Sequence, residues 1–151
     1  MNDAAAPDAP PATVLVVEDE ALVAMLVADA LADAGYRPVC TPDGRTGLAA
    51  SGPGAEVRAA VVDLRLADGL DGRWVVRDLR EERPALPVVV VTGFHPEAPQ
   101  ADLRGLGGPT LRLCKPFHGD DLAGVVAAVL DAPATPETPR RRRTDLLRAT
   151  A

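Results

Sequence analysis

The run VVVVT at Val88–Thr92 is the clearest buried strand in the chain. Four consecutive β-branched residues leave no polar position for a solvent-facing side. This pattern is typical of a parallel strand that is covered on both faces. Shorter apolar runs of the same kind lie at Thr13–Val17, Tyr36–Thr41, Arg58–Asp63 and Thr110–Cys114. The chain therefore offers five strands for one sheet.

Helical patterns separate these strands. We predict helices over Ala21–Ala34, Pro42–Ser51 and Gly72–Arg83, a weak helix within His95–Leu106, and a last helix that begins at Asp120 or Asp121. Asp19 stands where it could cap the first helix, and Gly35 would end it. Strands that alternate with helices indicate an α/β fold with a parallel sheet, helices on both faces and right-handed crossovers. The order of the strands does not follow from these patterns.

Apolar residues at helical spacing supply the rest of the predicted core. We expect inward or half-buried side chains at Leu22, Met25, Leu26, Val27, Leu31, Trp74, Val75, Val76, Leu79, Leu122, Val125, Val126, Val129 and Leu130. Trp74 is expected to be a packing residue and Cys114 a buried strand thiol.

Length, composition and charge limit the function. A chain of 151 residues, 47% of them hydrophobic, suits one domain with one core. Its formal net charge of −6 divides into +3 from Ala132 to the end and −9 elsewhere. An acidic body argues against a nucleic-acid-binding domain. With two cysteines lacking metal-ligand spacing, no long apolar run and no signal peptide, we expect a soluble, cytoplasmic protein with reduced thiols.

The chain divides into three parts. Residues 1–12 are expected to be a disordered leader and residues 13–132 the folded domain. In the Pro/Arg-rich tail, 133–151, the prolines suit an extended linker. Arg140–Arg143 suits a solvated basic run, with docking to a membrane surface or a partner as the alternative. Fewer than 20 residues follow the domain, so we expect no output domain and, in particular, no DNA-binding domain.

Polar residues stand at the ends of four predicted strands. Glu18-Asp19-Glu20 follows the first strand, Asp63 ends the third, Thr92 ends the fourth and Lys115 follows the fifth. Ligands of an open parallel sheet bind outside the carboxyl ends of its strands, so these groups are expected to share one pocket. Lys115 is the one Lys in the sequence beside fifteen Arg, which favours a position that needs a compact ammonium.

This set of side chains suits phosphoryl transfer assisted by Mg²⁺. Crowded carboxylates repel one another, and a hard dication with oxygen ligands relieves that repulsion. We expect Asp19 and Asp63 to bind Mg²⁺ directly and Glu18 to bind it through water. A carboxylate nucleophile can accept a phosphoryl group as an aspartyl phosphate. Mg²⁺ and Lys115 would neutralise the transferring oxygens, and the Thr92 hydroxyl would donate a hydrogen bond to one of them.

Four stretches carry a resemblance to a known family. They are VLVVEDE (Val14–Glu20), VVDLRL (Val61–Leu66), VVVVTG (Val88–Gly93) and LCKPF (Leu113–Phe117), in this order at strand ends. Over roughly Thr13–Ala132 the chain resembles the receiver domains of two-component response regulators, of the stand-alone type. The resemblance implies a flavodoxin-like, doubly wound, five-stranded sheet of order 2-1-3-4-5, an order for which a chemotaxis receiver is a standard example.

The resemblance also implies roles for the site residues. Asp63 would be the phosphorylated residue, Thr92 the switch hydroxyl, and Lys115 the family's lysine with a cis bond to Pro116. The Mg²⁺ ligands would be Glu18, Asp19, Asp63 and the backbone carbonyl of Arg65. The phosphoryl donor would be a phosphohistidine on a sensor histidine kinase or a histidine phosphotransfer protein.

The implied output is a change in protein–protein affinity. Phosphorylation would shift a two-state surface near the fourth and fifth strands, with a phosphorylation-dependent homodimer as one form of output. Pro96–Leu106 is the expected moving element. Such a module is not an enzyme, apart from assisting its own phosphorylation and dephosphorylation.

Several positions depart from the family pattern. Ala67 stands where a Pro is usual, and the loop from Asp63 to Gly72 is one residue longer than typical, which bears on loop shape and partner fit. Arg112 replaces the Tyr or Phe that the fifth strand often carries, so we expect no aromatic switch coupled to Thr92. The run Thr92–His95 is partly similar to single-domain receivers with a Thr-Gly-hydrophobic-Tyr motif, and His95 could modulate the site.

Other interpretations stay open. A phosphorylation-independent adaptor could use the same fold, and a metal-dependent phosphatase could use an Asp nucleophile, although it usually needs two Asp spaced by one residue after the first strand. Taken singly, Glu18–Glu20 could be an acidic helix start, and Asp63, Thr92 and Lys115 could be ordinary strand-end residues. No Gly-x-Gly-x-x-Gly follows the first strand, which argues against a dinucleotide site.

Overall fold

A computed structural model describes residues 10–52, 54–66 and 71–132. Its elements are β1 (Thr13–Val17), α1 (Ala21–Asp33), β2 (Arg37–Thr41), α2 (Gly44–Ala50), β3 (Val57–Asp63), α3 (Gly72–Glu82), β4 (Val88–Thr92), the 3₁₀ turn η2 (Pro99–Ala101), β5 (Thr110–Cys114) and α4 (Gly119–Asp131). The expected tail at 133–151, most of the expected leader at 1–12, and Ala67 lie outside the described residues. Within the described residues, no helix is long and apolar enough to cross a bilayer.

The five strands form one parallel sheet in the order β2-β1-β3-β4-β5. This confirms the flavodoxin-like fold and the strand order 2-1-3-4-5. The register pairs Val17 with Val62 and Thr92 with Cys114, so the carboxyl ends of neighbouring strands lie at one edge. β2 lies on one side of β1 and β3 lies on the other, so the order in which successive strands join the sheet reverses between β1 and β3. A crevice at that reversal is where ligands of such sheets bind.

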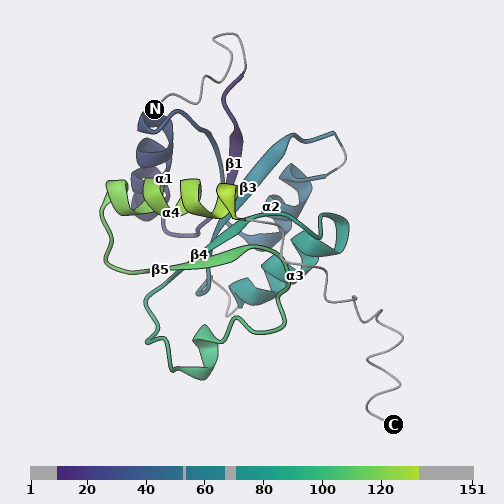
Figure 1. Ribbon diagram of the computed structural model, residues 1–151, viewed down its shortest axis with the longest axis vertical. Coiled ribbons are helices and arrows are strands. Elements are labelled where there is room, and N and C mark those ends of the chain that lie inside the picture. Colours follow the sequence, from purple (N-terminus) through teal and green to yellow (C-terminus); the bar gives the residue numbers. More distant parts are fainter. Residues whose placement is uncertain (1–9, 53, 67–70, 133–151) are drawn as a thin grey trace.

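Two layers of core cover the sheet, one on each face (Figure 1). Val88 and Val90 point to the layer under α2 and α3. Val89 and Val91 point to the layer under α1 and α4. All four are fully or nearly fully buried, which explains why this run has no polar position. Each buried Val contributes on the order of 1.5 kcal/mol of hydrophobic stabilisation, so the central strands anchor both layers.

Helix α1 buries a narrower face than its sequence pattern predicts. Val27 and Leu31 are buried against the sheet, but Leu22, Met25 and Leu26 are 76%, 61% and 48% exposed. The reason is that α1 touches the sheet on one side and α4 on another, so its remaining side faces solvent. The expected cap is also wrong, because the N-cap residue is Glu20 and its side chain makes no capping hydrogen bond.

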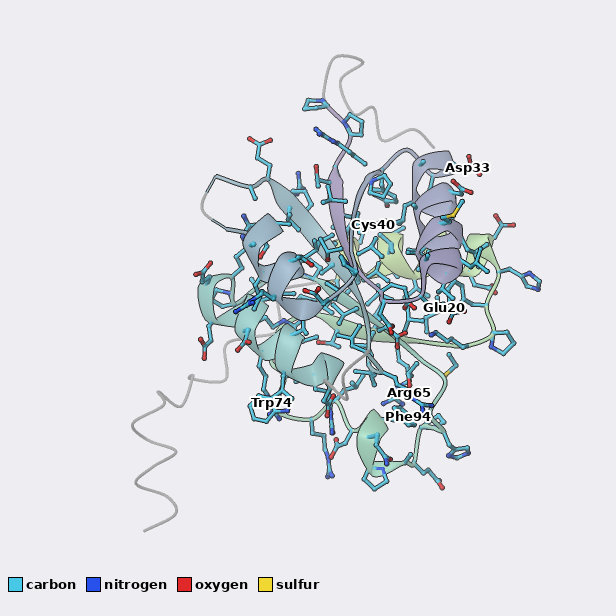
Figure 2. All side chains as sticks on the ribbon, turned by 180° about the vertical axis from the view of Figure 1, so that it is seen from behind. Glu20, Asp33, Cys40, Arg65, Trp74 and Phe94 are labelled. Atoms are coloured by element: carbon cyan, nitrogen blue, oxygen red, sulfur yellow. The ribbon has the colours of Figure 1, made fainter. Side chains whose placement is uncertain are left out.

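Two further side chains, Trp74 and Cys114, are more exposed than expected. Trp74 is 59% exposed on α3, where it stacks against the Arg77 guanidinium at 5.1 Å from the ring centre (Figure 2). Cys114 is an exposed free thiol rather than a buried one, and Cys40 is exposed as well. β5 is an edge strand with one neighbour, which leaves its last residue open to solvent.

The weak helix predicted within His95–Leu106 is wrong. The only helical turn there is η2, three residues long. Pro96 and Pro99 cannot donate the backbone hydrogen bonds of an α-helix, and Gly105 has a positive φ that ends a helical run. The segment therefore needs other donors for its carbonyl groups.

Arginine side chains from α3 and β5 supply those donors. Arg73 donates to the carbonyls of Pro99 and Asp102, and Arg112 donates to that of Ala101. Arg80, only 3% exposed, donates to the carbonyls of Leu86, Leu106, Gly107 and Pro109 and to the Thr110 hydroxyl. Burial lowers the pKa of Arg80 to about 10, so it stays charged at neutral pH. Guanidinium groups thus replace a helix's internal hydrogen bonds.

Replacing Arg80 tests this account of the 95–110 segment. We expect Arg80→Met to lower the free energy of unfolding by about 2–4 kcal/mol, because it leaves several buried carbonyl groups without donors. Urea denaturation measures the change. Arg77→Met on the exposed side of the same helix is the control and should cost less than about 1 kcal/mol. Equal losses in the two variants would contradict the account.

Candidate functional site

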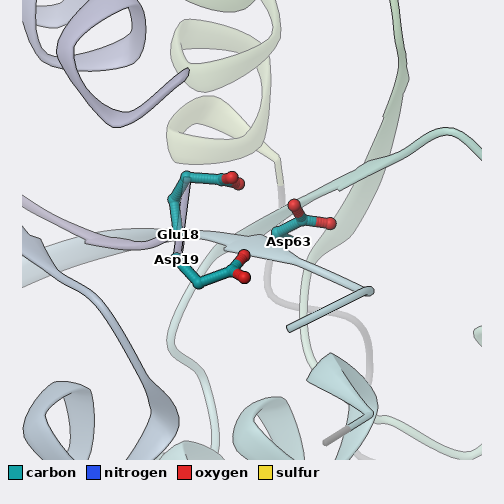
Figure 3. A group of neighbouring side chains, drawn as sticks. All are labelled: Glu18, Asp19 and Asp63. Carbon is teal, nitrogen blue, oxygen red and sulfur yellow. The ribbon is translucent and has the colours of Figure 1, made fainter. Parts of the chain in front are cut away.

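Three carboxylates meet at the crevice between β1 and β3. Glu18 and Asp19 directly follow β1, and Asp63 is the last residue of β3. Figure 3 shows the three side chains converging, and one oxygen of each lies within 4.8 Å of the others. Glu18 and Asp63 are buried, at 6% and 3% exposed, while Asp19 is exposed. One small cation could therefore contact all three groups.

Backbone hydrogen bonds fix the directions of the two buried carboxylates. The amide of Glu18 donates to the Thr41 carbonyl of β2 at 3.0 Å, which continues the sheet by one residue. The Glu20 amide donates to Oε1 of Glu18 at 3.2 Å. The Arg65 amide donates to Oδ1 of Asp63 at 2.9 Å. These contacts hold both carboxylates at the sheet edge rather than in solvent.

Gly72, the first residue of α3, allows the chain to return close to Asp63. Its amide donates to the Leu64 carbonyl at 2.9 Å. A Cβ at this position would lie 2.1 Å from the Asp63 carbonyl oxygen, which is impossible without moving the backbone. The start of α3 is therefore packed directly against the backbone of Asp63.

Lys115 brings the ammonium to the same site from β5. Its Nζ lies 2.9 Å from Oδ2 of Asp63. The expected cis bond to Pro116 is present, and the Lys115 amide donates to the Thr92 carbonyl at 2.8 Å. Burial acts to lower the pKa of Lys115, but the hydrogen bond to Asp63 and the charges of Asp63, Glu18 and Glu20 outweigh burial and raise it. Lys115 is therefore protonated beside Asp63.

Thr92 ends β4 and is 1% exposed. Its Oγ1 accepts a hydrogen bond from the Phe94 amide at 2.9 Å, so the hydroxyl hydrogen can still be donated. Thr92 does not line the cleft that surrounds the carboxylates. The two residues that follow it, Gly93 and Phe94, do line the cleft.

The cleft has a volume of about 740 Å³. Its lining residues are Glu18, Asp19, Glu20, Asp63, Arg65, Leu66, Gly93, Phe94 and Lys115. Figure 2 labels Glu20, Arg65 and Phe94 of this set. Glu20 lines the cleft as expected, whereas the lining roles of Leu66, Gly93 and Phe94 were not expected from sequence, although each stands within three residues of a strand end. His95 is exposed, accepts a hydrogen bond from the Glu97 amide and is not part of the lining.

The cleft is electrostatically unfavourable for three ionised carboxylates. Burial, a hydrogen bond shared with Asp63 and the charge of Asp63 raise the pKa of Glu18 to about 8. Lys115 offsets only part of this repulsion, since it contacts Asp63. A site with excess negative charge and only oxygen donors fits a hard divalent cation such as Mg²⁺. The side chains of Glu18, Asp19 and Asp63 are available to hold it, and Arg65 lines the same cleft.

The raised pKa of Glu18 predicts a pH dependence when divalent ions are absent. Between about pH 4.5 and pH 8 the folded protein keeps a proton on Glu18 that the unfolded chain releases, so the free energy of unfolding should fall as pH rises. Glu18→Gln should remove this component. Urea denaturation in EDTA at several pH values measures it, with the exposed Glu97→Gln as control. A wild-type slope equal to that of Glu18→Gln would contradict the prediction.

Known proteins similar to this chain share its fold and much of its length. Transcriptional regulatory protein TcrA of Mycobacterium tuberculosis is 35% identical over 134 residues, which cover 88% of this chain and 51% of TcrA. Photosynthetic apparatus regulatory protein RegA of Rhodovulum sulfidophilum is 34% identical over 130 residues, which cover 84% of this chain and 68% of RegA. The chain thus spans only about half the length of TcrA.

A solved structure and a family model also match this chain. The chemotaxis protein CheY4 of Vibrio cholerae superposes with a TM-score of 0.70 at 27% identity, over 79% of this chain and 98% of CheY4. The model of the response regulator receiver domain matches residues 14–127. These residues contain the five strands and most of the residues of α4. The chain therefore belongs to the response regulator receiver domain family of two-component signalling.

Proposed function

We propose that this chain is a phosphoryl acceptor in a two-component phosphorelay. Asp63 accepts the group from a phosphohistidine on a sensor histidine kinase or a histidine phosphotransfer protein, and the product changes the affinity for a protein partner. The observation that carries the proposal is the 2.9 Å contact between Lys115 and Asp63 inside a cluster of three carboxylates. A strand-end turn residue needs neither the ammonium beside it nor the acidic pair.

Asp63 and Lys115 are already in position for the transfer step, whereas Thr92, which lies outside the cleft lining, reaches a phosphoryl oxygen only after a local shift. An Asp63 oxygen attacks phosphorus, an O–P bond forms, and the P–N bond to the donor imidazole breaks with its electron pair leaving on nitrogen. As negative charge develops on the phosphoryl group, the Lys115 ammonium exchanges its contact with the Asp63 carboxylate for one with a phosphoryl oxygen. Thr92 donates its hydroxyl hydrogen to another phosphoryl oxygen. Mg²⁺ held by Glu18, Asp19, Asp63 and the Arg65 carbonyl supplies charge neutralisation.

The cleft is open enough for a protein-bound donor. Its lining includes the exposed Asp19 and Glu20, so an imidazole phosphate can approach Asp63 from that side. The signalling role of the receiver domain means that the phosphorylated form acts through a partner rather than by turnover. TcrA and RegA are named as regulatory proteins. We include in the proposal a regulatory output for this chain, with a phosphorylation-dependent homodimer as one form of it. We also include a cytoplasmic location.

An adaptor that works without phosphorylation is the main alternative. It would not require Asp63 to be buried beside Lys115, nor the buried Glu18 that raises the electrostatic cost of the apo site. A phosphatase with an Asp nucleophile has less support, because Glu18-Asp19-Glu20 does not supply the two Asp, spaced by one residue, that such enzymes usually carry after the first strand.

Chemical phosphorylation tests the proposal directly. We expect incubation with Mg²⁺ and acetyl phosphate to add one phosphoryl group, detected by intact mass and removed by hydroxylamine, because an aspartyl phosphate is a reactive mixed anhydride. Asp63→Asn and excess EDTA should each abolish the adduct, while the exposed Asp29→Asn on α1 should leave it unchanged.

Three outcomes would contradict the proposal. An adduct that persists in Asp63→Asn would place the acceptor elsewhere. Sustained Mg²⁺-dependent turnover of a generic phosphate ester would favour the phosphatase. Partner binding that is unchanged in Asp63→Asn would favour the adaptor.

A further inference from the structure

We propose that Arg73 and Arg112 form a clamp that couples the phosphorylation state of Asp63 to the position of the η2 turn. The inference rests on the proposed function of Asp63. It identifies the contacts through which phosphorylation of Asp63 moves the surface at η2. We call these two side chains the arginine clamp. Its two arms start on different elements, α3 and β5, and both end on the carbonyl groups of η2.

The clamp holds η2 from both sides. Nη1 of Arg73 donates to the Pro99 carbonyl at 3.0 Å and to the Asp102 carbonyl at 3.3 Å. Nη2 of Arg112 donates to the Ala101 carbonyl at 2.5 Å. Ala101 is fully buried, whereas Pro99 and Gln100 are exposed. The turn thus presents a short exposed surface whose backbone is held mainly by side chains of other elements.

One arm of the clamp leads from Arg73 back to Asp63. Asp71 accepts hydrogen bonds from Nε and Nη2 of Arg73, at 2.8 and 2.5 Å, which fixes the guanidinium plane. Asp71 pairs with Arg65 in a single antiparallel bridge. The Arg65 amide in turn donates to Oδ1 of Asp63 at 2.9 Å. The start of α3 therefore follows the position of this carboxylate oxygen.

The other arm leads from Arg112 to the second oxygen of Asp63. Arg112 lies in β5, opposite Val90 of β4, and three residues before Lys115. Nζ of Lys115 contacts Oδ2 of Asp63 at 2.9 Å. The two oxygens of Asp63 thus hold the inner ends of the two arms, and η2 joins their outer ends.

Phosphorylation cannot leave both inner ends unchanged. The aspartyl phosphate replaces the single charge of the carboxylate with about −1.5 to −2 on the phosphoryl group, and it brings three further acceptor oxygens. Lys115 then gains a better hydrogen-bond acceptor than Oδ2, in the form of a phosphoryl oxygen. The Arg65 amide gains no comparable new acceptor. The arms must shift relative to each other, and the weakest element between them is η2. Its own hydrogen bonds are few: Ala101 to the Ala98 carbonyl at 2.9 Å and Asp102 to that of Pro99 at 3.3 Å.

Arg112 itself carries a sign of a second arrangement. Its Nε is buried and, among the described residues, has no hydrogen-bond partner, although Nη2 of the same guanidinium is engaged. A buried donor without an acceptor costs free energy. A shift of β5 against η2 that gives Nε an acceptor would recover it, which favours two discrete positions over one.

Hydrogen–deuterium exchange of the 95–106 segment tests the clamp. The full chain with Mg²⁺ is compared with and without acetyl phosphate, as wild type, Arg112→Met and Arg73→Met. We expect phosphorylation to speed exchange at η2 by about fivefold or more in wild type. Both variants should exchange fast in either state and lose the difference, while the stoichiometry of the Asp63 adduct stays unchanged.

Two controls separate coupling from a purely structural role. Arg104→Met removes a guanidinium that pairs only with the Asp102 carboxylate in the same segment, and it should keep the wild-type difference. Arg112→Lys keeps one donor for the Ala101 carbonyl, and it should restore at least part of the difference that Arg112→Met loses.

The outcomes distinguish this inference from the proposed function. No adduct on wild type would overturn the function and, with it, the clamp. An adduct with unchanged exchange at η2 would overturn the clamp alone. The same result follows if Arg112→Met and Arg73→Met keep the full wild-type difference, or if Arg104→Met loses it.

Discussion

Repulsion among three carboxylates, held in place by the sheet, is the constraint on which the rest of this molecule depends. Parallel pairing of β1 with β3 brings Glu18, Asp19 and Asp63 together, so their oxygens lie within 4.8 Å of one another. Lys115 is the one Lys in the sequence, and its Nζ lies 2.9 Å from Oδ2 of Asp63. Excess negative charge in a partly buried cleft makes the site ready to accept a divalent cation and, next to that cation, an anionic phosphoryl group.

Much of this site could be predicted because parallel strands end at a common edge. Once Val14–Val17, Val61–Val62 and Val88–Val91 are assigned to strands, Glu18, Asp63 and Thr92 must lie near one another. Solvent exposure was harder to predict. The periodicity that identifies α1 does not reveal how much of its surface a neighbour covers, and Leu22 and Met25 are consequently exposed. The strand order rested on the family resemblance, since local patterns do not encode which strands are neighbours.

The segment between β4 and β5 could not be predicted, for a different physical reason. Apolar residues such as Leu103 and Leu106 suggest a helix, but prolines and glycines remove its hydrogen bonds. Arg73, Arg80 and Arg112, far away in sequence, supply the missing donors. Arginine carries five N–H donors on one rigid plane, and Arg80 thereby reaches four carbonyl groups, more than the three donors of a Lys ammonium could serve. The Arg-rich composition therefore has a structural purpose, and it leaves η2 dependent on elements that meet at Asp63.

Binding of Mg²⁺ is the property that follows most directly from the carboxylate cluster, and isothermal titration of the metal-free chain at pH 7.5 measures it. The account predicts one Mg²⁺ site that Asp19→Asn weakens by about tenfold or more and that Asp29→Asn, outside the cleft, leaves unchanged. Identical affinities in wild type and Asp19→Asn, or no binding at all, would contradict it.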